Sequence, residues 1–152
     1  MMEFDETIKK VGGSAMNITT LGIDIAKQVF QLHGTDGHAK VTLRKRLRRN
    51  QLLTFMQQLR PCLVGMEACA GAHYWAKKFQ SYGHTVKLIA PQYVKPYVKT
   101  NKNDYNDAEA IYVAVTRPNM RFAGIKADWQ QDIQALHRVR SRLMQSRTTL
   151  AN

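Results

Sequence analysis

The chain has 152 residues and a formal net charge of +12, with 23 Lys and Arg against 11 Asp and Glu. An apolar fraction of 44% excludes an intrinsically disordered protein, and the length suits one folded domain with a small appendage. So basic a balance favours a polyanionic partner, with nucleic acid first. A soluble protein that is merely cationic has the same composition and stays an alternative.

The two cysteines, Cys62 and Cys69, form no Cys-x-x-Cys pair, and the five histidines show no zinc-ligand spacing. We therefore expect reduced thiols rather than a disulfide framework or a zinc site. The N-terminus lacks the basic start and apolar run of a signal peptide, and no apolar stretch has the length of a membrane span. We expect a cytoplasmic protein that does not enter a membrane.

Three strands are predicted first along the chain. Residues 1–17 are polar, contain Gly-Gly-Ser and are expected to form a flexible leader. An apolar, β-branched run at 18–25 predicts a central strand, and 27–33 and 40–47 predict two more. Turn residues at 34–37 join these as an antiparallel hairpin.

Helices and strands then alternate. Asn50 is expected to cap a helix with an apolar stripe that ends before Pro61. A strand at 62–68, a helix at 72–82, a strand at 84–90 and a helix at 104–116 follow. This order predicts an α/β fold in which helices flank a mixed sheet.

The tail, residues 128–152, has a different pattern. Its apolar residues recur at every seventh position or lie beside that row: Trp129, Ile133, Leu136, Val139, Leu143 and Leu150. Four arginines surround this stripe: Arg138, Arg140, Arg142 and Arg147. The pattern predicts an extended helix that packs on a partner helix, giving a homo-oligomer, or that follows a phosphate backbone. An ordinary amphipathic helix folded on its own domain is an equal alternative.

Two acidic residues interrupt apolar strands. Side chains alternate along a strand, so Gly22 shares a face with Asp24, and Gly65 shares one with Glu67. We interpret the two glycines as room for metal ions or a phosphate beside each acid. Bulges and simple packing are rival explanations for glycine in a strand.

A second acidic pair, Asp104 and Asp107, opens the predicted helix. The two are three residues apart and therefore neighbours, on the side that continues through Ala108, Ile111 and Val115 toward the sheet. Helix capping explains such a pair as well as catalysis does.

Four converging acids would favour a cation. Like charges at about 4 Å repel by roughly 4 kcal/mol at an effective dielectric near 20, so the group either protonates in part or binds cations. Oxygen ligands select a hard ion, which predicts Mg²⁺, with two ions expected and Mn²⁺ able to substitute.

Basic residues predicted to bind nucleic acid fall in three groups. The densest run contains Arg44, Lys45, Arg46, Arg48 and Arg49, a group precedes the acidic pair at Lys95, Lys99 and Lys102, and Arg138 and Arg142 lie on the tail. The run at 44–49 is equally typical of a solvated strand end, although the overall charge favours phosphate contact.

Three long motifs, at 22–27, 66–76 and 95–110, resemble the DEDD transposases of bacterial insertion elements, relatives of the Piv DNA invertase. The segments 117–122 and 131–137 are similar to that family too. The resemblance implies a RuvC-like, ribonuclease-H-type domain over residues 18–127, with Asp24, Glu67, Asp104 and Asp107 as catalytic and metal-binding residues.

The resemblance also implies DNA recombination guided by a structured RNA. Family members continue into a second domain that supplies a nucleophilic serine, and this chain ends at Asn152, in the helix that would lead there. A stand-alone metal-dependent nuclease of the junction-resolvase type is the main alternative. A non-catalytic nucleic-acid-binding module is another.

Overall fold

The computed structural model describes residues 17–99 and 104–151, without the side chains of Asp104 and Tyr105. The predicted leader therefore lies outside the described residues, except for Asn17. The strands are β1 (Thr20–Ile25), β2 (Val29–Thr35), β3 (Val41–Arg48), β4 (Leu63–Glu67), β5 (Thr85–Ile89) and β6 (Phe122–Ala123). The helices are α1 (Arg49–Gln58), α2 (Ala72–Ser81), α3 (Pro91–Val94), the 3₁₀ turn η2 (Lys95–Tyr97), α4 (Asp104–Val115) and α5 (Asp128–Ala151).

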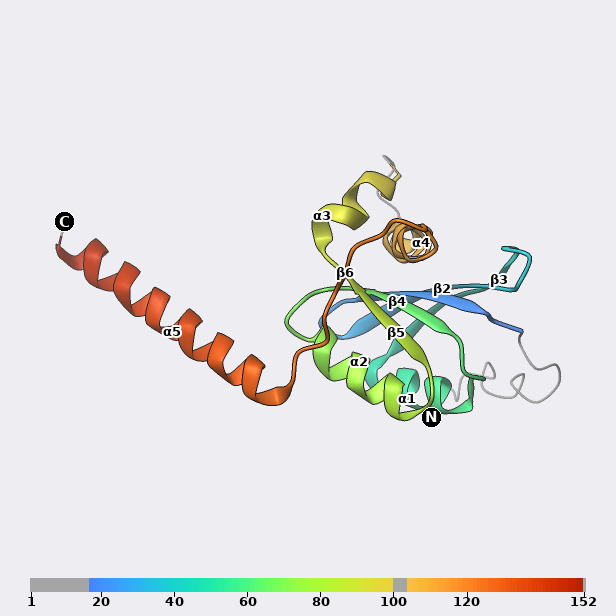
Figure 1. Ribbon diagram of the computed structural model, residues 1–152, viewed down its shortest axis with the longest axis horizontal. Coiled ribbons are helices and arrows are strands. Elements are labelled where there is room, and N and C mark those ends of the chain that lie inside the picture. Colours follow the sequence, from blue (N-terminus) through green and yellow to red (C-terminus); the bar gives the residue numbers. More distant parts are fainter. Residues whose placement is uncertain (1–16, 100–103, 152) are drawn as a thin grey trace, which may run out of the picture.

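The strands form one mixed sheet in the order β3-β2-β1-β4-β5-β6. The first three strands are antiparallel neighbours, β1, β4 and β5 run parallel, and β6 pairs antiparallel with β5. Helix α4 covers one face of the sheet, and α1 and α2 cover the other (Figure 1). The predicted mixed sheet flanked by helices is confirmed, although the sequence did not indicate β6.

Each face of the sheet has its own apolar core. Leu21 and Ile23 of β1 are fully buried with Trp75 of α2 in the larger core, on the side of α1 and α2. On the other side, Ile111 and Ala114 of α4 are fully buried in a smaller cluster. Helix α4 is therefore held against the sheet by apolar packing, as predicted for its inward face.

The predicted cap of α1 is wrong by two residues. Strand β3 runs directly into α1, so Arg48 is the N-cap and Asn50 lies within the first turn. The Gln51 side-chain oxygen accepts a hydrogen bond from the Arg48 N–H at 2.9 Å, which satisfies the backbone where strand becomes helix.

Helix α5 extends away from the sheet domain (Figure 1). Its start is held by an ion pair between Lys77 and Asp128 and by a 3.0 Å hydrogen bond from Lys126 Nζ to Gln134. Leu136, Leu143 and other apolar side chains farther along it are exposed. The predicted extended helix is confirmed, and the alternative of a helix packed on its own domain is wrong. In the described part of the chain, no helix combines the length and apolarity needed to span a membrane.

Candidate functional site

Two carboxylates lie side by side on one face of the sheet. The parallel strands β1 and β4 are paired so that Gly22 lies beside Gly65 and Ile23 beside Met66. Asp24 and Glu67 are the next residues of the two strands, and both side chains are partly buried. Alternation puts them on the face of the two glycines. The strand register therefore sets the two acids next to each other.

The two glycines make room for helix α4 rather than for ions. A Cβ added at Gly22 would lie 2.3 Å from the Ala108 carbonyl oxygen and 2.7 Å from the Tyr112 nitrogen. A Cβ added at Gly65 would lie 2.8 Å from the Val115 Cβ. Because helix atoms fill this space, the interpretation of the glycines as room for metal ions or a phosphate is wrong. They permit the close approach of α4 to the sheet.

Close approach of α4 brings a third acid to the strand pair. Asp107 directly precedes Ala108, whose carbonyl lies over Gly22, and its side chain is exposed. Burial raises the pKa of Glu67, and the negative charges of Asp24 and Asp107 raise it further. The three carboxylates thus interact although they come from separate parts of the sequence. Asp104 is the first residue of α4, and its side chain lies outside the described residues.

The donor chemistry of this group fits a divalent ion. A half-buried carboxyl that shares a region with two other acids is stabilised in its ionised form by a cation. Within the described side chains, no three His, Cys, Asp or Glu residues stand close enough to enclose a metal. Carboxylate oxygens are the ligands that Mg²⁺ uses together with water and phosphate.

Two further residues lie beside the acids and were not predicted. Antiparallel pairing sets Gln31 of β2 directly opposite Asp24, and His33 opposite Gly22. The His33 ring contacts Tyr112 of α4, with ring centroids 5.2 Å apart. Burial lowers the pKa of His33. Alternation along β2 puts these two residues on one face of the strand, but their places opposite Asp24 and Gly22 follow from the β1–β2 register, which the sequence does not fix.

The basic run at 44–49 divides between the two faces of the sheet. His33 pairs with Arg44 and Gln31 pairs with Arg46, so these arginines extend the rows of Gly22 and Asp24 across edge strand β3. Arg48, two residues farther, shares their face. Lys45 instead lies over the Phe55 ring of α1, and Arg49 lies over the Trp75 ring, 5.1 Å from its centroid.

The lysines before α4 differ among themselves. Lys99 donates to Glu109 of α4 at 2.7 Å, and this contact lowers the pKa of Glu109. Lys95 is exposed on η2, and Lys102 lies outside the described residues. Lys99 therefore helps to hold the start of α4 beside the acids, in addition to any contact with a substrate.

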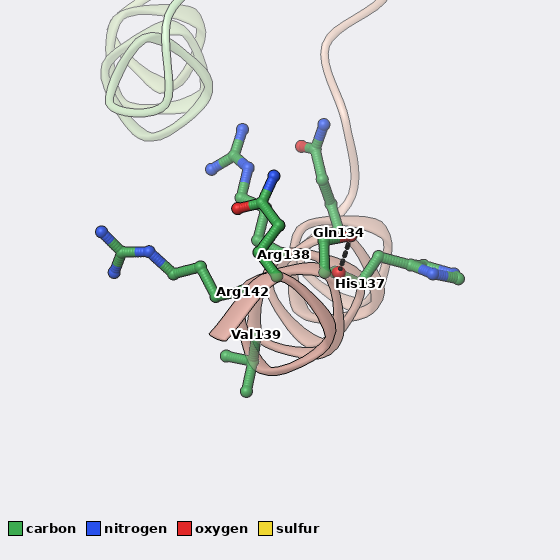
Figure 2. Close-up of a pocket in the computed structure, with 7 residues that line it drawn as sticks. Gln134, His137, Arg138, Val139 and Arg142 are labelled. Carbon is green, nitrogen blue, oxygen red and sulfur yellow. Dashed lines mark hydrogen bonds between the residues drawn. The ribbon is translucent and has the colours of Figure 1, made fainter. Parts of the chain in front are cut away.

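The arginines of α5 also fall on two sides. Arg138 and Arg142 are four residues apart and line a shallow groove with Gln134 and His137, whereas Val139 points away from them (Figure 2). Arg140 and Arg147 are four and eleven residues after Leu136, which places them in the apolar stripe. Helix α5 therefore has one polar, basic side and one apolar side that carries two arginines.

The cysteines are free thiols, as predicted. Cys62 is buried beside His84, whose Nδ1 accepts a hydrogen bond from the Cys62 N–H at 3.3 Å and whose Nε2 lies 2.8 Å from the Met56 carbonyl oxygen. Burial raises the pKa of Cys62 to about 11. Neither the Cys62 thiol nor the His84 ring has the surroundings of a reactive site.

The sequence matches a known protein family along most of its length. The DEDD_Tnp_IS110 family model, described as "Transposase", matches residues 21–152. A "Probable family 20 transposase" of Pseudomonas aeruginosa is 56% identical over 137 residues, which cover 90% of this chain and 40% of the relative. The transposase for insertion sequence element IS1111A of Coxiella burnetii is 49% identical over 144 residues, covering 95% of this chain and 40% of the relative.

The chain is also similar to another insertion-element transposase and to one solved structure. The transposase for insertion sequence element IS1328 of Yersinia enterocolitica is 48% identical over 136 residues, covering 90% of this chain and 41% of the relative. The chain thus spans about two fifths of the length of these curated relatives. The structure of "T. thermophilus RuvC in complex with Holliday junction substrate" covers 63% of this chain and 90% of its own, with a TM-score of 0.49 and 15% identity.

Proposed function

Because the chain belongs to the DEDD transposase family of the IS110 type, we propose that it is the N-terminal catalytic part of a transposase. Residues 18–127 form the catalytic domain, and 128–152 form a helix that leads toward a second domain. That second domain supplies the nucleophilic serine, and a structured RNA guides the reaction. The protein acts on DNA in the cytoplasm.

One observation carries this proposal. Asp24, Glu67 and Asp107 come from two strands and a helix, and the pKa of Glu67 responds to both other acids. A carboxylate with a purely structural role gains nothing from two acidic neighbours, because like charges repel. The chain has only 11 Asp and Glu, so a group of three is conspicuous. We assign these three residues, with Asp104, as the ligands of two Mg²⁺ ions, for which Mn²⁺ substitutes.

The roles of the residues follow from their positions. When bound, the ions stabilise negative charge that develops on a phosphodiester during strand cleavage. The acids hold the ions, and the packing of α4 over Gly22 keeps Asp107 in place. Arg44, Arg46 and Arg48, on the same face of the sheet, hold phosphates of the substrate. Lys95, exposed on η2, contacts the same substrate, and Lys102 is assigned to it from the sequence alone.

Helix α5 serves two partners through its two sides. The apolar side packs against a second copy of the chain, and the polar side with Arg138 and Arg142 contacts DNA or the guide RNA. Exposed fractions of 70% for Leu136 and 66% for Leu143 favour this assignment, because such a row of apolar side chains seldom stays in water. Arg140 and Arg147 in the apolar stripe limit how two helices align.

The proposal is tested with the 152-residue chain and with a longer protein that includes the serine-bearing domain. We expect the chain alone to bind Mn²⁺ and DNA without cleaving, and the longer protein to exchange strands when guide RNA is present. Asp24→Asn should abolish Mn²⁺ binding, measured by isothermal titration calorimetry.

The alternative functions give different results in these assays. Magnesium-dependent nicking by the 152-residue chain alone would favour a stand-alone nuclease. DNA binding with no Mn²⁺ binding at any accessible concentration would favour a non-catalytic module and contradict the proposal.

A further inference from the structure

Gln31 of β2 has no role in the functional assignment above, yet its side chain is buried at the carboxylate site. Only 6% of the residue is exposed, and its Oε1 atom has no hydrogen-bond partner. We propose that Gln31 belongs to the divalent-ion site, where its carboxamide oxygen is a neutral donor to the hydrated ion. This inference rests on the proposed function.

The register of the sheet places Gln31 next to the acids. It is paired directly with Asp24, and such opposite residues have Cβ atoms about 4.5–5.5 Å apart. Directly opposite residues share a face of the sheet, and His33, two residues along, contacts α4 through Tyr112. Gln31 therefore lies on the α4 face. Gln31 is paired on its other side with Arg46 of β3, and Glu67 directly follows Met66, the β4 partner of Ile23.

A buried oxygen without a partner is costly. Leaving a buried acceptor unsatisfied costs about 1–3 kcal/mol, whereas an apolar group of the same shape has no such cost. Among the residues that the structure describes, Gln31 Oε1 is the buried side-chain oxygen or nitrogen atom that lacks a hydrogen-bond partner. For folding alone, methionine or leucine would serve better here. A buried glutamine at this position is explained if its side-chain oxygen binds a ligand from outside the protein.

The chemistry of the neighbours identifies that ligand as a hydrated cation. Gln31 is an uncharged oxygen donor directly opposite the Asp24 carboxylate. A neutral oxygen adds coordination without adding further like charge, and Mg²⁺ and Mn²⁺ accept amide oxygens and water together with carboxylates. An anion would instead be repelled by Asp24 and Glu67.

Two readouts on the 152-residue chain test the inference: the melting temperature in EDTA and Mn²⁺ affinity by calorimetry. Gln31→Met keeps the length and apolar stem of the side chain but removes its polar atoms. We expect it to be at least as stable as the wild type in EDTA, and to bind Mn²⁺ about 10-fold more weakly or worse. Gln31→Glu, which adds charge to the same position, should bind Mn²⁺ more tightly than Gln31→Met.

Thr35→Val is the matched control. Thr35 is a buried polar residue on the same strand and face, four residues or about 13 Å from Gln31. Its substitution should leave Mn²⁺ affinity unchanged. If Gln31→Met melts lower in EDTA and binds Mn²⁺ as the wild type does, Gln31 is only a structural residue and the inference is wrong. If the wild type itself binds no Mn²⁺, the proposed function fails instead.

Discussion

Adding one methyl group at Gly22 should push helix α4 away from the sheet. The new Cβ would lie 2.3 Å from the Ala108 carbonyl oxygen, whereas ordinary contact begins at 3.4 Å. Relief therefore requires α4 to move by about 1 Å. The neighbouring atoms are helix backbone, so no change of side-chain rotamer avoids the clash.

The expected cost of Gly22→Ala is about 3 kcal/mol, the upper end of the usual range for overpacking. For a chain of this size that lowers the melting temperature by roughly 6–12 °C, measured in EDTA by circular dichroism. Because Asp107 precedes Ala108, the shift of α4 should also weaken Mn²⁺ binding. Gly124→Ala is the control, since no atom lies within 4 Å of its added Cβ.

Metal-free stability separates packing from ion binding. If Gly22→Ala melted as the wild type does in EDTA and lost only Mn²⁺ affinity, the space above Gly22 would belong to an ion. The close packing of α4 would then be refuted.

Three further outcomes are expected. Glu67→Gln should raise the melting temperature in EDTA at pH 7, because the fold raises the pKa of Glu67 and so disfavours its ionised form. The gain in melting temperature should vanish below about pH 4.5, where Glu67 is protonated in the unfolded chain too. A gain that is constant with pH would contradict this. Leu136→Glu should abolish self-association in analytical ultracentrifugation, whereas Arg138→Glu should leave it intact and weaken DNA binding; equal effects on assembly would oppose the two-sided helix. Iodoacetamide at pH 8 should label Cys69 and spare Cys62, as mass spectrometry would show, since Cys62 has a pKa of about 11 and is buried; rapid labelling of Cys62 would contradict its burial.

Much of the sheet could be predicted because its strands are apolar and bounded by turn residues or proline. The run at 18–25 and its hairpin partners match β1, β2 and β3 within two residues at each end. Strand β6 escaped prediction because two residues, Phe122 and Ala123, carry no periodicity. The prediction of Asn50 as the N-cap of α1 was wrong because β3 continues directly into the helix, which therefore begins before Asn50.

The candidate site was predicted in part. Alternation within each strand suffices to put Gly22 with Asp24, and Gly65 with Glu67. What fills the space above a glycine depends on tertiary packing, so the role of α4 was missed. Gln31 was missed because its significance comes from burial and from the lack of a partner, which no pattern in the sequence reveals.

Strand β3 ends the sheet, and an outermost strand offers unpaired backbone groups to any other extended chain. Arg44, Lys45, Arg46 and Arg48 give this border a dense positive charge that repels a second copy of itself. Neutralising them all to study phosphate contact would also remove this protection against aggregation. Arginine-to-lysine variants keep the positive charge of β3, and variants at one position remove only one charge. Both kinds allow the phosphate contacts to be mapped while the edge strand stays protected against aggregation.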